Sequence, residues 1–151
     1  MFPDFKELSR CFHAHGVKYL IVGGYAVSFH AQPRATKDLD LFIRADPENA
    51  QTTYAALVDF GAPLEGITVA DLENPAKFIR FGEPPVAVDI LPAIDGVNFD
   101  EAWLRRVEGV VDEGTGLTAF FISRDDLIAS KLAAGRTRDL ADVEEIRESG
   151  K

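Results

Sequence analysis

The sequence of 151 residues contains a single cysteine, Cys11, and this scarcity excludes two kinds of structure. One cysteine cannot form an intrachain disulfide, and it cannot supply the several thiolates of a cysteine-based zinc site. Phe5, Leu8 and Phe12 recur around Cys11 at helical spacing, so we expect a buried thiol with a structural role. The chain is long enough to bury a sizeable core without such cross-links.

Long apolar runs are also missing from the sequence. No segment approaches the roughly 18 consecutive apolar residues that a membrane-spanning helix needs. The N-terminus carries the charged residues Asp4, Lys6 and Glu7, which a signal peptide would not have at these positions. We therefore expect no membrane partner and a cytoplasmic location.

Basic residues are fewer than acidic residues, because 16 Lys and Arg stand against 25 Asp and Glu, for a formal net charge of −9. Tight nonspecific binding to nucleic acid requires clustered Lys and Arg, so the acidic balance argues against that class of protein. A local basic patch remains compatible with this composition. The sequence shows no repeat or linker, and its length favours one domain over residues 1–151.

The most informative stretch of the sequence is 19–44. Residues 19–22 form a short apolar run that predicts a buried strand. Gly23 and Gly24 follow directly, and glycines at a strand end allow a sharp turn and a close approach of a ligand to the main chain. Residues 25–30 can then begin a helix. The first N–H groups of such a helix lack intrahelical partners and form a site for an anion.

Two aspartates, Asp38 and Asp40, stand two residues apart in a second predicted strand, 38–43. Residues i and i+2 of a strand face the same side, so the two carboxylates should point together. Adjacent carboxylates repel each other unless a cation lies between them, and paired hard oxygen ligands suit Mg²⁺, which also binds substrate phosphates. A solvated edge strand is the alternative interpretation, which the apolar continuation of the strand disfavours.

A third aspartate, Asp89, lies in the apolar segment 86–91, which we expect to form an antiparallel hairpin with 77–81. A buried carboxylate is unfavourable unless it is paired or bound to a metal. If segment 86–91 lies beside strand 38–43, Asp89 joins the aspartate pair. The alternative is a strand-end aspartate that caps the turn at Pro92.

The rest of the sequence mixes helical and strand patterns. Helices are predicted over 3–15, 46–60, 99–107, from Ser123 to Gly135, and over 138–148. Short strands are predicted over 67–69, 107–111 and 117–122. The predicted fold class is therefore α/β (α+β), with a mixed β-sheet flanked by helices and with helices at the C-terminal end.

The ordered set of Gly23-Gly24, then Asp38-x-Asp40, then Asp89 resembles the nucleotidyltransferases related to DNA polymerase beta. The segment GGYAVSFHAQPRATKDLDLFI is most similar to their small bacterial branch, which includes the abortive-infection toxin-type transferases and the lincosamide nucleotidyltransferases. The C-terminal segment KLAAGRTRDLADVEEI also resembles that branch. The resemblance therefore covers most of the chain.

The resemblance implies the nucleotidyltransferase fold and the Mg²⁺-dependent transfer of a nucleoside monophosphate from an NTP to a hydroxyl. It implies that the catalytic residues Asp38, Asp40 and Asp89 also hold the metal, as one or two Mg²⁺ ions, with Asp89 as base or shared ligand. The family commonly has a serine after the first glycine, where this chain has Gly24, so that hydroxyl contact is either missing or supplied by Ser28. The nucleotide-binding residues implied in this way are Gly23, Gly24, Ser28, Arg34, Lys37 and Lys131.

Each of the cations in this set also has a purely structural interpretation. Arg34 and Lys37 could bind phosphate or balance the aspartates, but each is also compatible with a solvated surface charge. Lys131 lies on an apolar helix face and resembles the family's C-terminal lysine near the nucleotide, with an internal salt bridge as its rival. We interpret the neighbouring charges as a local ion-pair cluster. This cluster comprises Arg136, Arg138, Asp139 and Asp142.

The acceptor of the transferred group remains open among a small antibiotic, a tRNA end and a protein side chain, in a resistance or toxin–antitoxin context. The alternative class is a non-catalytic interaction protein, antitoxin-like or orphan, that keeps the fold; the intact set of three aspartates argues against it. A chain of this size has little room for a separate acceptor domain. We therefore expect a homodimer in which the two subunits share a cleft.

Overall fold

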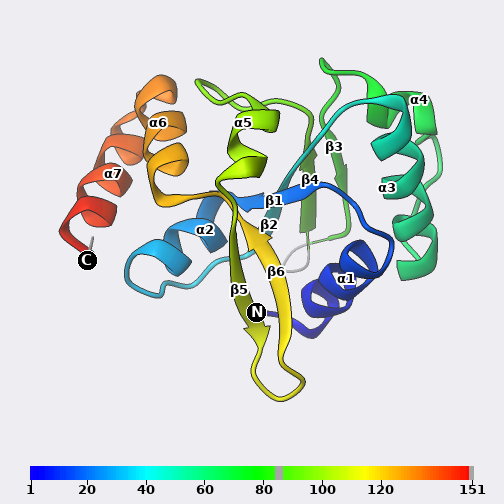
Figure 1. The fold of residues 1–151 in the computed structure, drawn as a ribbon, viewed down its shortest axis with the longest axis horizontal. Helices are drawn as coiled ribbons and strands as arrows, with labels where there is room; N and C mark the ends of the chain where they lie inside the picture. The colour runs from blue at the N-terminus through cyan, green and yellow to red at the C-terminus, as the bar shows by residue number, and fades with distance from the viewer. Residues whose placement is uncertain (84–86, 150–151) are drawn as a thin grey trace.

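The computed structural model describes residues 1–83 and 87–149, and it contains a mixed sheet with helices packed against it (Figure 1). The helices are α1 (Pro3–Ala14), α2 (Gly23–His30), α3 (Pro47–Phe60), α4 (Val69–Glu73), α5 (Phe99–Leu104), α6 (Arg124–Ala134) and α7 (Thr137–Ser149). The strands are β1 (Tyr19–Val22), β2 (Asp38–Ile43), β3 (Ile79–Phe81), β4 (Ala87–Leu91), β5 (Val107–Asp112) and β6 (Leu117–Phe121). This arrangement confirms the predicted fold class.

The sheet has the strand order β3-β4-β2-β1-β6-β5. β2 is parallel to β4, and β1 is parallel to β6, whereas the pairs β1–β2, β3–β4 and β5–β6 are antiparallel. The parallel register of β2 and β4 places Asp40 directly beside Asp89. The topology therefore meets the condition stated from the sequence, under which Asp89 joins the other two aspartates.

Burial explains why β1 and β2 occupy the middle of the sheet. All four residues of β1 are buried, which is typical of a strand covered on both faces. In β2, the buried Leu39 and Leu41 alternate with the partly exposed Asp38 and Asp40. Because successive strand residues face opposite sides, the two leucines pack into the core while the two carboxylates share the other face.

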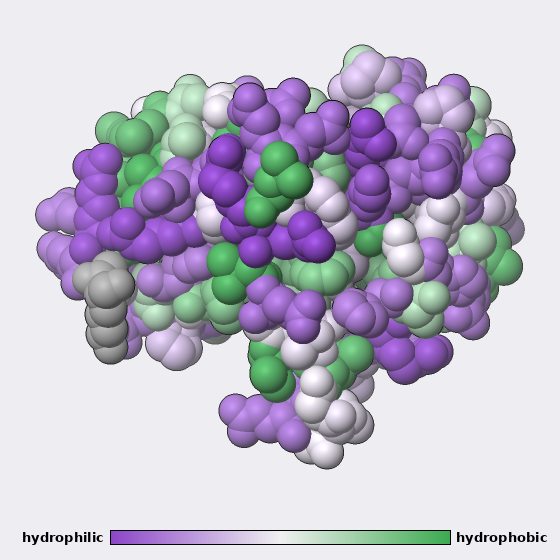
Figure 2. All heavy atoms as spheres, in the orientation of Figure 1, coloured by the Kyte–Doolittle hydropathy of each residue, from purple (hydrophilic) through white to green (hydrophobic). Residues whose placement is uncertain are grey.

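All of these helices except α5 form two groups around the sheet (Figure 1). Helices α1, α3 and α4 pack together on one side, and α2, α6 and α7 pack together on the other. The face shown in Figure 2 is mostly hydrophilic, with separate apolar patches. Over residues 1–83 and 87–149, no helix combines the length and the hydropathy that crossing a membrane requires.

Side-chain caps begin and glycines end several helices, as the sequence predicted. Asp46 and Ser123 accept hydrogen bonds from the main-chain N–H groups three residues later, at the starts of α3 and α6. Gly61 and Gly135 end the same two helices in the left-handed conformation. Cys11 is a buried free thiol in α1, as expected. These local signals are therefore enough to predict where α3 and α6 begin and end.

The prediction of a strand over 67–69 was wrong. Val69 is instead the first residue of α4, which runs to Glu73. Thr68 and Asp71 form a reciprocal capping box, in which each side chain accepts a hydrogen bond from the other residue's main-chain N–H. This local hydrogen bonding outweighs the strand propensity of two β-branched neighbours.

The helix predicted over 99–107 is shorter than expected, because α5 ends at Leu104. Val107 already belongs to β5, where it pairs with Phe121 of β6. The strand pairing of β5 with β6 therefore includes the last residue of the predicted helix, Val107.

The predicted antiparallel hairpin is present as the β3–β4 pair. The first strand begins at Ile79 rather than at residue 77. The predicted second strand included Val86, which lies with Pro84 and Pro85 outside the described residues.

Candidate functional site

A cleft of about 580 Å³ opens beside β1, β2 and the start of α2. Most of the site residues predicted from the sequence line it, namely Gly23, Gly24, Arg34, Lys37, Asp38, Asp40 and Lys131. Asp89 lies beside Asp40 on β4 without being part of the cleft wall. Ser28 does not line the cleft either. Segments that are distant in the sequence therefore converge here, and two predicted residues stand back from the wall.

Helix α2 begins at Gly23 rather than after the glycine pair, so both glycines belong to its first turn. The residue before it, Val22, is extended and provides no side-chain cap, whereas α3, α4, α5 and α6 each begin with a capping side chain. The first N–H groups of α2 therefore donate no hydrogen bond to a capping side chain. A helix start of this kind attracts anions, because its N–H groups and its dipole both favour negative charge.

Gly23 packs directly against the carboxylate of Asp40. A Cβ atom at Gly23 would overlap the Oδ2 atom of Asp40, so no larger residue fits. Gly23 also has a φ of +66°, a conformation that side chains disfavour. The antiparallel register explains the contact, because Val22 pairs with Asp40. The start of α2 and the aspartate pair thus form one continuous surface.

We expect Gly23→Ala to lower the free energy of unfolding by about 2–4 kcal/mol, because the left-handed backbone and the overlap with Asp40 both oppose a methyl group. Gly66→Ala is the matched control, since Gly66 also has a positive φ, +77°, but a Cβ there would meet nothing within 4 Å. The control should lose only about 1–2 kcal/mol. Urea unfolding of both variants measures the difference, and equal losses would contradict the close packing of Gly23 on Asp40.

Asp40 has the most strongly perturbed carboxylate in the cleft. Burial is the largest cause, followed by repulsion from Asp89 and then from Asp38, and together they raise the pKa of Asp40 to about 7. The positive charge of Lys131 lowers this pKa in part. The three aspartates therefore carry more negative charge than the surrounding residues balance, and a bound cation would relieve the repulsion among them.

Arg80 on β3 is a counter-charge that the sequence pattern did not indicate. Its Nη1 atom donates to Oδ1 and Oδ2 of Asp89 at 3.0 and 2.8 Å, and its Nη2 atom lies 3.5 Å from Oδ2 of Asp38. The β3–β4 register places Arg80 directly opposite Asp89. The hydrogen bonds found for Asp89 thus go to Arg80 and not to the turn at Pro92, which was the alternative interpretation of this aspartate.

Within the described ranges, no three His, Cys, Asp or Glu side chains are arranged to hold a metal ion. The chemistry of the three aspartates nevertheless suits Mg²⁺, because carboxylate oxygens are its preferred protein ligands. One guanidinium group does not balance three carboxylates, and repulsion from Asp89 and Asp38 adds to the effect of burial in raising the pKa of Asp40. The donor set therefore fits a divalent cation, while the present arrangement places Arg80 between Asp38 and Asp89.

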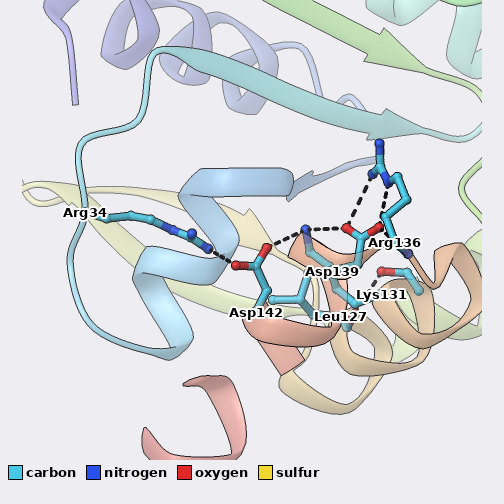
Figure 3. A network of polar contacts seen from close by, with 7 residues as sticks. Arg34, Leu127, Lys131, Arg136, Asp139 and Asp142 are labelled. Carbon is cyan, nitrogen blue, oxygen red and sulfur yellow. Dashed lines mark hydrogen bonds and ion pairs between the residues drawn. The ribbon is translucent and has the colours of Figure 1, made fainter. Parts of the chain in front are cut away.

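Lys131 lines the cleft from α6 and belongs to a polar network with α7 (Figure 3). Its Nζ atom lies 3.4 Å from Oδ1 of Asp139 and 3.0 Å from Oδ2 of Asp142. Arg136 also contacts Asp139, with 2.6 Å between Nε and Oδ2, and Arg34 contacts Asp142 at 3.0 Å. The internal salt bridge proposed as the rival role of Lys131 is therefore present. A contact between Lys131 and phosphate stays a prediction.

The remaining predicted residues lie on α2 and on the segment between α2 and β2. Arg34 and Lys37 line the cleft. Ser28 accepts a hydrogen bond from the main-chain N–H of Arg34, at 3.3 Å, so its hydroxyl supports this segment. Ser28 thus contacts the main chain of Arg34 but does not line the cleft.

Phe78 is a cleft residue that the sequence analysis missed. It precedes β3, lines the cleft and is 65% exposed, which is unusual for a large apolar side chain. Leu91, Ala93 and Ile94 line the same cleft and add further apolar surface. Nothing in the sequence indicated that Phe78 would line a cleft, because an apolar residue at this position is also what a predicted strand over 77–81 would contain.

Comparisons with known proteins agree with this geometry. A family model described as "Nucleotidyltransferase of unknown function (DUF6036)" matches residues 4–148. The crystal structure of the lincosamide antibiotic adenylyltransferase LnuA with lincomycin bound is similar in fold, with a TM-score of 0.60 and 15% sequence identity. The similarity covers 99% of this chain and 98% of that chain. The comparison with curated proteins gives no match.

Proposed function

We propose that this chain, which belongs to the DUF6036 nucleotidyltransferase family, transfers a nucleoside monophosphate from an NTP to an acceptor hydroxyl. The packing of Gly23 against Asp40 carries the proposal, because it joins an uncapped helix start to a carboxylate group within one cleft. A nucleoside triphosphate with its metal ion requires an anion site and a cation site side by side. A cleft with only an anion site, or only a cation site, would favour a simpler ligand.

In this proposal the first turn of α2 binds the β- and γ-phosphates through the N–H groups of Gly23 and Gly24. Arg34, Lys37 and Lys131 supply positive charge along the same cleft wall. Ser28 acts on the phosphates only indirectly, through the segment that carries Arg34. These groups hold the leaving pyrophosphate in place and orient the α-phosphate.

Asp38, Asp40 and Asp89 would hold Mg²⁺, as one or two ions. When bound, Mg²⁺ neutralises negative charge on the transferred phosphate and on the leaving oxygen. The acceptor oxygen forms a bond to the α-phosphorus, and the bond from phosphorus to pyrophosphate breaks. Asp89 either accepts the proton of the attacking hydroxyl or shares in holding the cation.

The acceptor remains open among a small molecule, a tRNA end and a protein side chain. A small hydroxylated antibiotic is the first acceptor to test, and ATP the first donor, because the similar structure is that of a lincosamide antibiotic adenylyltransferase. The exposed ring of Phe78 offers apolar contact area for such a molecule. The homodimer, the cytoplasmic location and a resistance or toxin–antitoxin role stay predictions.

A non-catalytic protein that keeps this fold is the second candidate, and one observation favours it. Arg80 already neutralises Asp38 and Asp89 in the way expected of a site that has lost its metal. Such a protein would bind a partner and would show no metal-dependent affinity for NTP. Metal-dependent NTP binding therefore separates the two candidates.

We expect purified protein with Mg²⁺ to transfer label from α-labelled NTP to an acceptor in cell extract. The Asp38→Ala/Asp40→Ala double variant should show no transfer, because it removes two of the three cation ligands. Calorimetry provides the second readout, since Mg²⁺-dependent NTP binding should disappear in the same variant. Unchanged Mg-NTP affinity in the double variant would refute the assignment of these two aspartates.

A further inference from the structure

We infer that Arg80 is an internal counter-ion that occupies the place of a divalent cation between Asp38 and Asp89, so that cation binding requires Arg80 to move away. The inference rests on the proposed function, because it assumes that these aspartates hold the cation. It assigns to Arg80 control over metal binding, a role separate from the transfer reaction.

The contacts of Arg80 are those of a bridging cation. One nitrogen, Nη1, donates to both carboxylate oxygens of Asp89 at 3.0 and 2.8 Å. The other, Nη2, reaches across β4 to Oδ2 of Asp38 on β2, at 3.5 Å. Charge-assisted hydrogen bonds of this kind are stronger than neutral ones, so a metal ion must replace the stabilising contacts that Arg80 makes with the two aspartates. Both oxygens of Asp89 already accept hydrogen bonds from Arg80, so a metal shared with Asp38 would compete with the guanidinium for them.

The position of Arg80 on the sheet allows it to leave. β3 is an edge strand, at one end of the strand order. Ile79 and Phe81 on either side of Arg80 are only 5% and 7% exposed and anchor the strand in the core. The side chain of Arg80 itself is 50% exposed. The guanidinium can therefore swing into solvent without disturbing the packing of β3.

This arrangement couples the metal to the nucleotide. A cation without nucleotide must compete with Arg80 for the aspartates, and it gains contacts with the carboxylates alone. A triphosphate adds anionic oxygens to the same cleft, and a displaced guanidinium pairs well with phosphate. Because the coupling between two ligands is reciprocal, each should bind more tightly in the presence of the other.

Mn²⁺ binding to the full chain without nucleotide tests the inference, with free Mn²⁺ measured by electron paramagnetic resonance. Arg80→Gln should bind Mn²⁺ roughly tenfold more tightly than the wild type, a gain of about 1.4 kcal/mol. Arg44→Gln is the matched control, because it removes the same charge from a guanidinium paired with Asp46 and Asp100 beyond the opposite end of β2. The control should leave the affinity unchanged.

Arg80→Lys is a second variant that keeps the charge but cannot bridge both aspartates with a planar fork. Its Mn²⁺ affinity should lie between those of the wild type and Arg80→Gln. The thermal shift on adding Mn²⁺ gives an independent readout, and it should be larger for Arg80→Gln than for the wild type.

The outcomes separate this inference from the proposed function. Wild-type Mn²⁺ binding that Arg80→Gln leaves unchanged or weakens would overturn the role of Arg80 alone. Equal tightening in Arg44→Gln would also overturn it, because overall charge would then explain the effect. Failure of both the wild type and Arg80→Gln to bind Mn²⁺ would overturn the proposed metal site as well.

Discussion

Asp40→Asn is expected to reduce nucleotide transfer by about 10³-fold or more and, at the same time, to stabilise the free protein. The loss follows from removing a cation ligand that contributes several kcal/mol to the transition state. The gain follows because Asp40 is partly buried beside Asp89, and asparagine keeps its shape without the charge. We expect the free energy of unfolding at pH 8 to rise by about 1–3 kcal/mol.

The pH dependence of stability has a definite sign for this residue. Burial and the neighbouring carboxylates raise the pKa of Asp40 to about 7, so between about pH 4 and pH 7 the folded chain keeps a proton that the unfolded chain has released. Stability should therefore fall as the pH rises through this window and level off above it. Asp40→Asn should remove this part of the slope.

Urea unfolding across pH 5–8 and the label-transfer assay measure the two effects together. Asp125→Asn is the control, because its side chain is 89% exposed and its charge lies on α6. Asp89→Asn is the useful contrast, since it also relieves repulsion but loses the carboxylate charge and one of the two oxygens that accept hydrogen bonds from Arg80. A destabilised Asp40→Asn variant would show that the carboxylate has a structural role that outweighs its repulsion.

Asp139→Asn is expected to lower the free energy of unfolding by about 3–5 kcal/mol, the usual effect of breaking a buried ion pair. The side chain of Asp139 is only 1% exposed and accepts hydrogen bonds from Lys131 and Arg136 (Figure 3). It also accepts one from the main-chain N–H of Arg136, at 3.3 Å. The variant leaves these donors without a carboxylate at the junction of α6 and α7.

This contribution should disappear in acid. The hydrogen bond from Arg136, with the charges of Arg136 and Lys131, holds the pKa of Asp139 below its usual value. The stabilisation is therefore complete above the usual pKa of about 4 and is lost as the pH falls through the lower folded-state value. Wild type and Asp139→Asn should converge in stability toward low pH. A constant difference down to pH 2 would contradict the ion-pair explanation.

Several features followed from the sequence alone because their causes are local. The apolar run of β1 and the alternation of leucines and aspartates in β2 predict strand geometry within four to six residues. Asp46 and Ser123 predict helix starts through hydrogen bonds that span three residues. The order of glycines and aspartates along the chain was sufficient for the resemblance to nucleotidyltransferases, and the family match agrees with it.

Only the tertiary structure decided which groups meet inside the cleft. Whether Arg80 faces Asp89 depends on the register of β3 and β4, and a shift of one residue would turn Arg80 to the other face of the sheet. The contact of Gly23 with Asp40 and the pairing of Lys131 with Asp139 likewise depend on how distant segments pack. Sequence periodicity predicts the face on which a side chain lies, but the partner on that face is set by long-range packing.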